Sequence, residues 1–146
     1  MFLIDTNVVS ELRKPRPHPS VVAWLQAVPE RNLYLSAVTS GELQRGVEIT
    51  RRQDAAKAAE IEAWVQLVAE SWNVLPMDAR VFRRWATLMD GRPDDLMEDA
   101  MIAATALVHQ LTVVTRNLKD FARLGVKTLD PFTVSGTAAE THIAVP

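Results

Sequence analysis

The segment Met1-Phe2-Leu3-Ile4-Asp5-Thr6-Asn7 decides the fold prediction, because it places an acid directly after an apolar run. Consecutive apolar residues of this kind are typical of a strand buried on both faces, and Thr6 and Asn7 predict a turn into a helix. A carboxylate at the end of a buried strand is costly unless it has a partner. We therefore take Asp5 as the first candidate for a functional side chain.

Four further short apolar segments continue this pattern, with helical sequences between them. The predicted strands cover residues 2–5, 33–36, 73–75, 112–115 and 127–129. Helices are predicted around residues 21–28, from about residue 43, over 54–71 and 81–89, and from Asp99 to about His109. Strands that alternate with helices predict an α/β fold with a central, mainly parallel sheet of about five strands.

The composition is that of one globular domain. The chain has 146 residues, of which 48% are hydrophobic and 23% charged, so it can bury a sizeable core. No apolar run approaches the roughly 20 residues of a membrane span, and the first residues lack the pattern of a secretory signal, so we expect a soluble, cytoplasmic protein. We predict a domain over residues 1–132. Residues 135–146 have weak periodicity and small polar side chains, so we predict that residues 133–146 form a tail that is flexible or contacts a partner.

The residue types present limit the chemistry of any site. The absence of cysteine excludes disulfides, thiolate zinc sites and a cysteine nucleophile. The three histidines, His18, His109 and His142, are too dispersed for a zinc motif, so any metal should be a hard cation held by oxygen. The net charge of −2 argues against a nucleic-acid-binding protein that is basic over its whole surface, but it allows local basic clusters.

Three more acids occupy positions comparable to that of Asp5. Glu42 follows the second predicted strand, Asp99 starts an alanine-rich helix, and Asp120 follows the fourth strand. Open parallel sheets bind ligands beyond the carboxyl ends of their strands, where all four acids are expected. Clustered carboxylates repel one another unless a cation neutralises them, and Mg²⁺ or Mn²⁺ would do so. The four acids therefore predict a metal site suited to phosphodiester hydrolysis.

Each acid also has a purely structural interpretation. The segment Thr39-Ser40-Gly41-Glu42 fits a capping box, in which Glu42 bonds back to the start of its helix. The segment Asn117-Leu118-Lys119-Asp120 fits a similar cap, and Asp99 suits the positive end of a helix. For Asp5 this interpretation is weaker, since Thr6 or Asn7 could cap the following helix instead. A capping residue can also be a metal ligand.

Four segments, taken together, resemble the signature blocks of the PIN-domain ribonucleases, especially the VapC and FitB-type toxins of bacterial toxin–antitoxin modules. They are FLIDTN (2–7), LSAVTSGEL (35–43), DAMIAATA (99–106) and LTVVTRNLKDF (111–121), in family order. The resemblance implies a three-layer α/β/α sandwich, a homodimer, and a cognate antitoxin that blocks the site. It also implies an endoribonuclease that depends on Mg²⁺ or Mn²⁺ and cleaves single-stranded RNA.

The resemblance also assigns roles to the acids. Asp5, Glu42 and Asp99 match the three core acids of the family, whereas some relatives have an aspartate where this chain has Asn117. Asp120 is therefore the candidate for the fourth charge. We expect Asp5 and Asp99 to bind the ion most directly, Glu42 to orient or deprotonate the attacking water, and Asp120 to complete the shell.

Five neighbouring polar residues are predicted to support these acids or to contact RNA. Thr6 and Asn7 would shape the loop around Asp5, and Thr115 and Asn117 would support the acids as polar neighbours. For Arg116 a contact to a substrate phosphate and a structural or solvated role both stay open.

Three other functions also stay open. A haloacid-dehalogenase-like phosphatase has an aspartate after its first strand, but its motif has a second aspartate where this chain has Asn7. A response-regulator receiver expects an acidic pair and a later lysine, which Lys119 matches poorly. A non-catalytic protein-binding module would use the acids only as helix caps. Metal-dependent RNA cleavage would separate the nuclease from this module, and incorporation of phosphate from a phosphodonor would favour the receiver.

Overall fold

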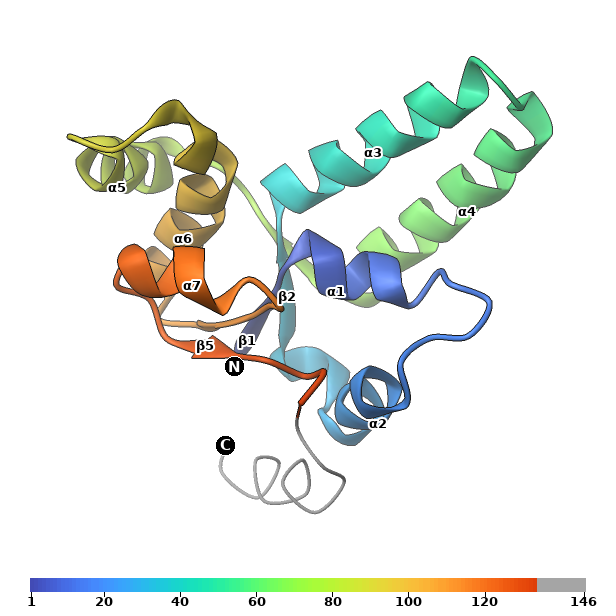
Figure 1. Ribbon diagram of the computed structural model, residues 1–146, viewed down its shortest axis with the longest axis horizontal. Helices are drawn as coiled ribbons and strands as arrows, with labels where there is room; N and C mark the ends of the chain where they lie inside the picture. Colours follow the sequence, from blue (N-terminus) through green and yellow to red (C-terminus); the bar gives the residue numbers. More distant parts are fainter. Residues whose placement is uncertain (134–146) are drawn as a thin grey trace.

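A sheet of five parallel strands forms the middle layer of the molecule, in the order β3-β2-β1-β4-β5 (Figure 1). The computed structural model describes residues 1–133. The strands are β1 (Phe2–Ile4), β2 (Leu33–Ser36), β3 (Asn73–Leu75), β4 (Thr112–Val114) and β5 (Thr128–Leu129). Each lies where the sequence predicted a strand, and every pairing is parallel.

Helices cover both faces of this sheet. They are α1 (Thr6–Glu11), α2 (Pro19–Ala27), α3 (Ala37–Arg51), α4 (Ala55–Ser71), α5 (Ala79–Met89), α6 (Met97–His109) and α7 (Leu118–Arg123), with short 3-10 turns at Glu30–Asn32 and Asp94–Leu96. The predicted start of α3 near Leu43 is wrong. The helix begins at Ala37, because Ser36 is its N-cap and Ser36 Oγ accepts a 3.2 Å hydrogen bond from the backbone N–H of Val38.

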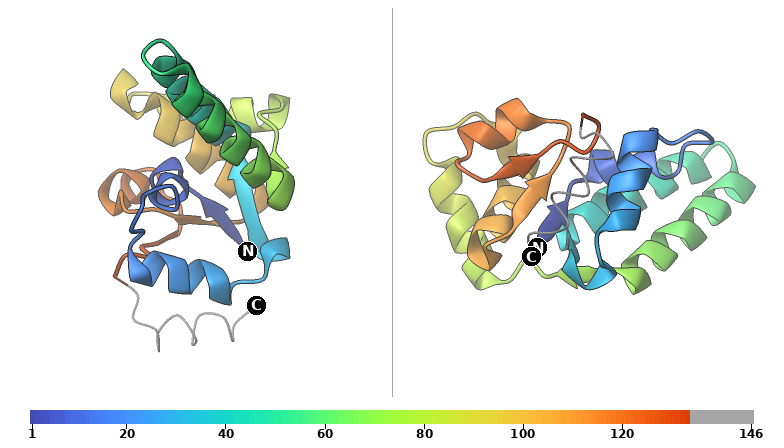
Figure 2. Two further views of the ribbon diagram at one scale, coloured as in Figure 1. Left: turned by 90° about the vertical axis from the view of Figure 1, so that its right-hand side faces the viewer. Right: turned by 90° about the horizontal axis from the view of Figure 1, so that it is seen from below.

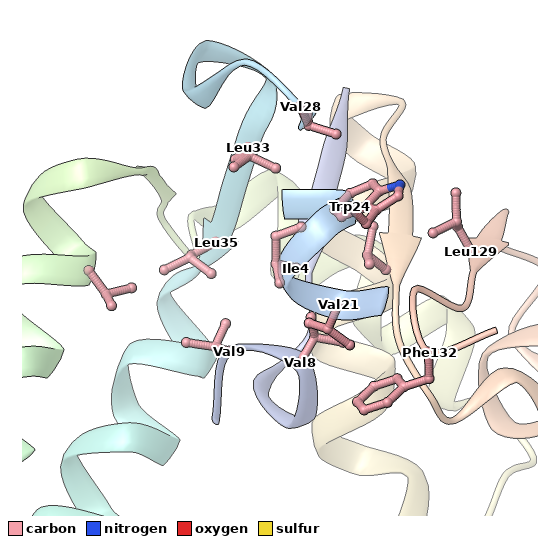
Figure 3. Close-up of a cluster of buried hydrophobic side chains, with 12 residues drawn as sticks. Ile4, Val8, Val9, Val21, Trp24, Val28, Leu33, Leu35, Leu129 and Phe132 are labelled. Carbon is pink, nitrogen blue, oxygen red and sulfur yellow. The ribbon is translucent and has the colours of Figure 1, made fainter. Parts of the chain in front are cut away.

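Alternation of side chains along β1 divides the core in two. Ile4 faces a cluster formed with α1, α2 and α4, in which Trp24 is fully buried (Figure 3). Leu3 faces the opposite cluster, which α6 and α7 cover. The small residues of α6, such as Ala100 and Ala103, let this helix lie close to the sheet. The three-layer α/β/α prediction is confirmed.

Helices α3 and α4 form a hairpin that extends away from the sheet (Figures 1 and 2). A third cluster of buried side chains holds the two helices together: Val47, Ala58, Ile61 and Val65. The hairpin therefore carries part of its own core.

The order of the strands creates a switch point between β1 and β4. The chain proceeds from β1 through β2 to β3 on one side and then adds β4 and β5 on the other. Ile4 and Val114 are paired at the ends of the two central strands. Asp5 and Thr115 therefore leave the sheet next to each other, where open α/β sheets form their ligand-binding crevice.

Two further sequence predictions concern membrane-spanning segments and the C-terminal tail. Within residues 1–133, no helix is both long and apolar enough to cross a membrane. The predicted tail at 133–146 lies, beyond Thr133, outside the described residues. The domain boundary at 132 stays a prediction.

Candidate active site

All four predicted acids lie at the carboxyl edge of the sheet, and each comes from a different helix or helix cap. Asp5 precedes α1, Glu42 belongs to α3, Asp99 lies in the first turn of α6 and Asp120 in that of α7. The first turns of α1 and α3 lie beside each other in Figure 1, with α6 and α7 on the other side of the strand ends. Hydrogen bonds made by the side chains and backbone N–H groups of Thr6, Thr115 and Asn117 join the four acids into one group, which we call the acid network.

Asp5 is the most buried acid of the network, with 5% of its surface exposed. Its Oδ1 accepts a 2.8 Å bond from the backbone N–H of Thr6, and its Oδ2 accepts bonds from Thr115 Oγ1 at 2.8 Å and Asn7 Nδ2 at 3.1 Å. Asp5 itself therefore caps α1, which was the weaker of the two interpretations that the sequence allowed. Burial raises the pKa of Asp5, and the bonds from Thr115 and Thr6 oppose that shift.

Thr6 connects Asp5 to Glu42. The Thr6 hydroxyl donates a 3.1 Å bond to Glu42 Oε1 and lies 3.1 Å from the hydroxyl of Thr39. The capping-box interpretation is wrong, because Thr39 lies inside α3 and Ser36 caps it. Burial, followed by the charges of nearby acids, raises the pKa of Glu42 to about 7, which the Thr6 bond only partly offsets.

Asn117 bridges the other two acids. Its Nδ2 donates to Asp99 Oδ2 at 3.1 Å and to Asp120 Oδ2 at 3.0 Å, so both amide hydrogens are used. Its backbone N–H donates a 2.9 Å bond to Thr115 Oγ1. Asn117 stands at the N-cap position of α7 but makes no capping bond with its side chain, so the cap predicted for residues 117–120 is wrong.

The charges in the acid network act on one another. Burial is the main cause that raises the pKa of Asp99 to about 6, and the carboxylates of Asp5, Asp120 and Glu98 add to it. Glu98 also raises the pKa of Glu42. Sequence analysis missed Glu98. Its position directly before Asp99 was the only signal for it, and a residue one position along a helix normally points elsewhere.

Arg116 lies beside the acid network. Its backbone N–H donates a 3.3 Å bond to Asn7 Oδ1, and its guanidinium carbon lies 3.6 Å from the centre of the Phe132 ring. This stacking fixes one face of the guanidinium and leaves the exposed side chain at the rim of the site.

Glu11 is a buried acid that sequence analysis also missed. It forms a 2.6 Å ion pair with Lys14 Nζ and accepts a 3.1 Å bond from the backbone N–H of His18. The Lys14 contact is the main cause that lowers the pKa of Glu11. These bonds fix the segment between α1 and α2, so we assign Glu11 a structural role.

The donors of the acid network suit a hard divalent cation. They are carboxylate oxygens, and of the four acids only Asp120 has a cationic side chain of residues 1–133 within 4.0 Å, Arg123 Nη1 at 3.9 Å. In that same part of the chain no three histidine, aspartate or glutamate side chains are grouped closely enough to hold one ion directly. The acid network therefore fits an ion that is bound directly by one or two carboxylates and retains several water ligands, as Mg²⁺ does.

Comparison with known proteins gives the family. The model of the PIN domain family matches residues 2–127. The chain is 36% identical over 140 residues to VapC ribonuclease Y4jK of Sinorhizobium fredii, which covers 90% of this chain and 98% of the relative. Its fold is similar to that of FitAcB from Neisseria gonorrhoeae, with a TM-score of 0.81, 32% identity, and 91% and 99% of the two chains covered. A toxin–antitoxin complex from Klebsiella pneumoniae contains a similar chain, with a TM-score of 0.68, 28% identity, and coverage of 90% and 98%.

The family model and the Sinorhizobium relative each match most of the chain. This chain belongs to the PIN domain family.

Proposed function

We propose that this protein is a divalent-metal-dependent endoribonuclease that serves as the toxin of a toxin–antitoxin pair. The observation that carries the proposal is the acid network, in which neutral donors hold four carboxylates from distant parts of the chain at one edge of the sheet. The name of the Sinorhizobium relative, a VapC ribonuclease, supports the reaction. The similar chain in a toxin–antitoxin complex supports the biological role.

Asp5 and Asp99 would hold the ion directly, and Glu42 and Asp120 would contact it through water. When bound, Mg²⁺ or Mn²⁺ supplies positive charge against the phosphate oxygens of the substrate. The partial burial of Asp99 and the burial of Asp5 strengthen their interaction with a cation, because less water screens the charges.

Glu42 is the proposed general base. Without metal the pKa of the Glu42 carboxyl group is about 7, and a bound cation would shift it toward the charged form, which can accept a proton from water. The bond from Thr6 occupies Oε1, which leaves Oε2 as the atom for the proton. Thr6 would thus orient Glu42, while Thr115 and Asn7 hold Asp5, and Asn117 holds Asp99 and Asp120.

Arg116 is proposed to contact a substrate phosphate. Among residues 1–133 no carboxylate lies within 4.0 Å of its guanidinium, so its N–H groups can bind a phosphate. The Phe132 ring restricts the guanidinium to one orientation, which reduces the entropy lost on binding. Removing this ring should therefore weaken RNA binding through Arg116.

The proposed partners are single-stranded RNA, a cognate antitoxin and a second copy of the chain, in the cytoplasm where such RNA is found. An arginine from the antitoxin would fit the acidic pocket, because a guanidinium offers the carboxylates charge and parallel N–H donors. It would compete with the metal ion, which explains how an antitoxin could inhibit the enzyme.

The structure favours no second function. Asn7 donates to Asp5 at the position where the phosphatase motif has another acid, and the exposed Lys119 has no ion pair to the acid network within residues 1–133. Neither Glu42 nor Asp120 caps a helix, so a module that uses its acids only as caps does not fit.

Replacing Asp5 tests the proposal. We expect the wild type to cleave single-stranded RNA in Mg²⁺ or Mn²⁺ and not in chelator, and Asp5→Asn to lose nearly all activity. Asp54→Asn is the matched control, since it makes the same change at an exposed residue that caps α4, where asparagine caps equally well. Full activity of Asp5→Asn, or undiminished cleavage in chelator, would contradict the proposal.

A further inference from the structure

Three arginines on α5 form a second charged feature, separate from the acid network. Arg80, Arg83 and Arg84 line a shallow surface hollow of about 280 Å³ together with Thr87 and Val108. All three arginine side chains are exposed. We call this feature the α5 arginine surface.

The positive charges of this surface have no acidic partner in the part of the chain that the structure describes. No carboxylate oxygen of residues 1–133 lies within 4.0 Å of their guanidinium nitrogens, although Arg51 on α3 has two such partners, Glu48 at 3.1 Å and Glu62 at 2.8 Å. Spacings of three and four residues place like charges side by side on a helix, where they destabilise it. Such an arrangement suits a surface that an anion occupies.

The residue type indicates which anion fits. Arginine presents a planar set of N–H donors that matches phosphate oxygens in pairs, and it loses little hydration on binding. Three arginines in a protein whose net charge is −2 are a local concentration of positive charge. A chain of phosphodiesters can contact several of them at once.

The α5 arginine surface lies at the opposite end of α6 from the part of the acid network that α6 carries. Helices α5 and α6 pack together, and α6 carries Asp99 in its first turn and Val108 near its end. Val108 is nine positions after Asp99, so at a rise of about 1.5 Å per residue the two lie about 14 Å apart along the helix. A strand cut at the acid network must therefore extend past the scissile phosphate to reach the arginines.

We propose that the α5 arginine surface binds phosphates of the RNA substrate away from the bond that is cut. The inference rests on the proposed ribonuclease function. Four clustered acids repel RNA, and positive charge elsewhere on the protein offsets this repulsion and raises the local concentration of substrate. The surface makes the enzyme favour long RNA over short RNA.

The test compares two triple variants that remove the same charge. Arg80→Gln/Arg83→Gln/Arg84→Gln removes the surface, and Arg31→Gln/Arg52→Gln/Lys127→Gln removes three exposed positive charges elsewhere. Cleavage is measured on a long single-stranded RNA and on a short oligonucleotide that spans only the cleavage site. We expect the first variant to raise KM for the long RNA about tenfold, with kcat unchanged and the short substrate unaffected, and the second to change neither.

Binding of the long RNA in chelator, followed by fluorescence anisotropy, gives a readout that needs no activity. Loss of three phosphate contacts should lower the slope of log affinity against log salt by about 2 for a single strand. Equal effects of the two triple variants, an unchanged KM and affinity, or equal loss on long and short substrates would overturn the inference. If the wild type cleaves no RNA, the proposed function fails, yet the binding comparison still decides this inference. The single variant Arg83→Gln, expected to shift affinity in the same direction, replaces the triple variant should that one unfold.

Discussion

The hydroxyl of Thr115 donates a 2.8 Å hydrogen bond to Asp5 Oδ2, joining side chains 110 positions apart in the sequence. Both groups are buried, and this bond ties the end of β4 to the end of β1. It opposes the effect of burial on the pKa of Asp5, so the threonine keeps the carboxyl group easier to ionise.

Thr115→Val keeps the shape of the side chain and removes this bond. We expect a loss of about 1–3 kcal/mol in the free energy of unfolding without metal, because Asp5 loses a donor and the backbone N–H of Asn117 loses its acceptor. Urea denaturation measures the loss. Thr112→Val is the control, since Thr112 lies in β4 and its hydroxyl makes no hydrogen bond within residues 1–133. Equal stability of the two variants would show that the bond matters little.

The raised pKa values of Glu42 and Asp99 predict how stability depends on pH. The pKa of Glu42 rises from 4.5 to about 7 and that of Asp99 from 3.8 to about 6, so the folded state binds more protons than the unfolded state over this interval. Stability of the metal-free protein should therefore fall as the pH rises from about 4.5 to 7. Thermal denaturation in chelator measures this slope.

Metal binding should show the opposite trend, because the ion must displace these protons. We expect Mn²⁺ affinity to increase from pH 5 to 7, with proton release on binding that calorimetry in two buffers can detect. Glu42→Gln is the control, and its metal-free stability should fall less steeply with pH. A metal-free protein that becomes steadily more stable across this range would refute the assignment.

Asn117→Asp adds a third carboxylate between Asp99 and Asp120 and removes both amide donors. We expect this variant to be about 1–3 kcal/mol less stable than the wild type in chelator and to gain more stability from Mn²⁺. Asn117→Ala, which loses the same bonds without adding charge, separates the two causes. If the aspartate and alanine variants respond equally to Mn²⁺, the added charge has no effect on the ion.

Substitutions of Trp24 test how much the buried core contributes to the free energy of unfolding. Its ring is fully buried and meets Phe2 edge-on at 5.0 Å, while within residues 1–133 its Nε1 has no hydrogen-bond partner. Trp24→Ala should cost about 3–5 kcal/mol in unfolding free energy. Trp24→Phe should cost clearly less, because it removes the unpaired N–H along with part of the ring. Similar losses for both variants would mean that the indole N–H has a partner.

The sequence predicted the strands and the positions of the acids because each rests on a local signal. The apolar run ending at Asp5 is short, bounded and followed by turn residues, and the run before Thr115 has the same form. The start of α3 was misjudged for a similar reason. Apolar spacing becomes visible only at Leu43, whereas the first turns of α3 turn Thr39 and Glu42 toward the acid network.

The hydrogen-bond partners within the site could not be predicted, since they depend on which strands become neighbours. Asn117 bridges Asp99 and Asp120 only because α6 and α7 meet beyond β4. Glu11 is buried only because the segment after α1 folds back to present the His18 backbone N–H to it. No spacing in the sequence encodes either contact.

The central position of β1 determines when the sheet can form during translation. Of the five strands, β1 is translated before the others, yet one of its two neighbours, β4, ends at Val114, so the middle of the sheet cannot close until that residue has left the ribosome. Asp5 obtains its Thr115 partner only at that moment. A nascent chain without β4 therefore has neither the Thr115 and Asn117 donors nor Asp120, so its acid network is incomplete until most of the protein has been translated.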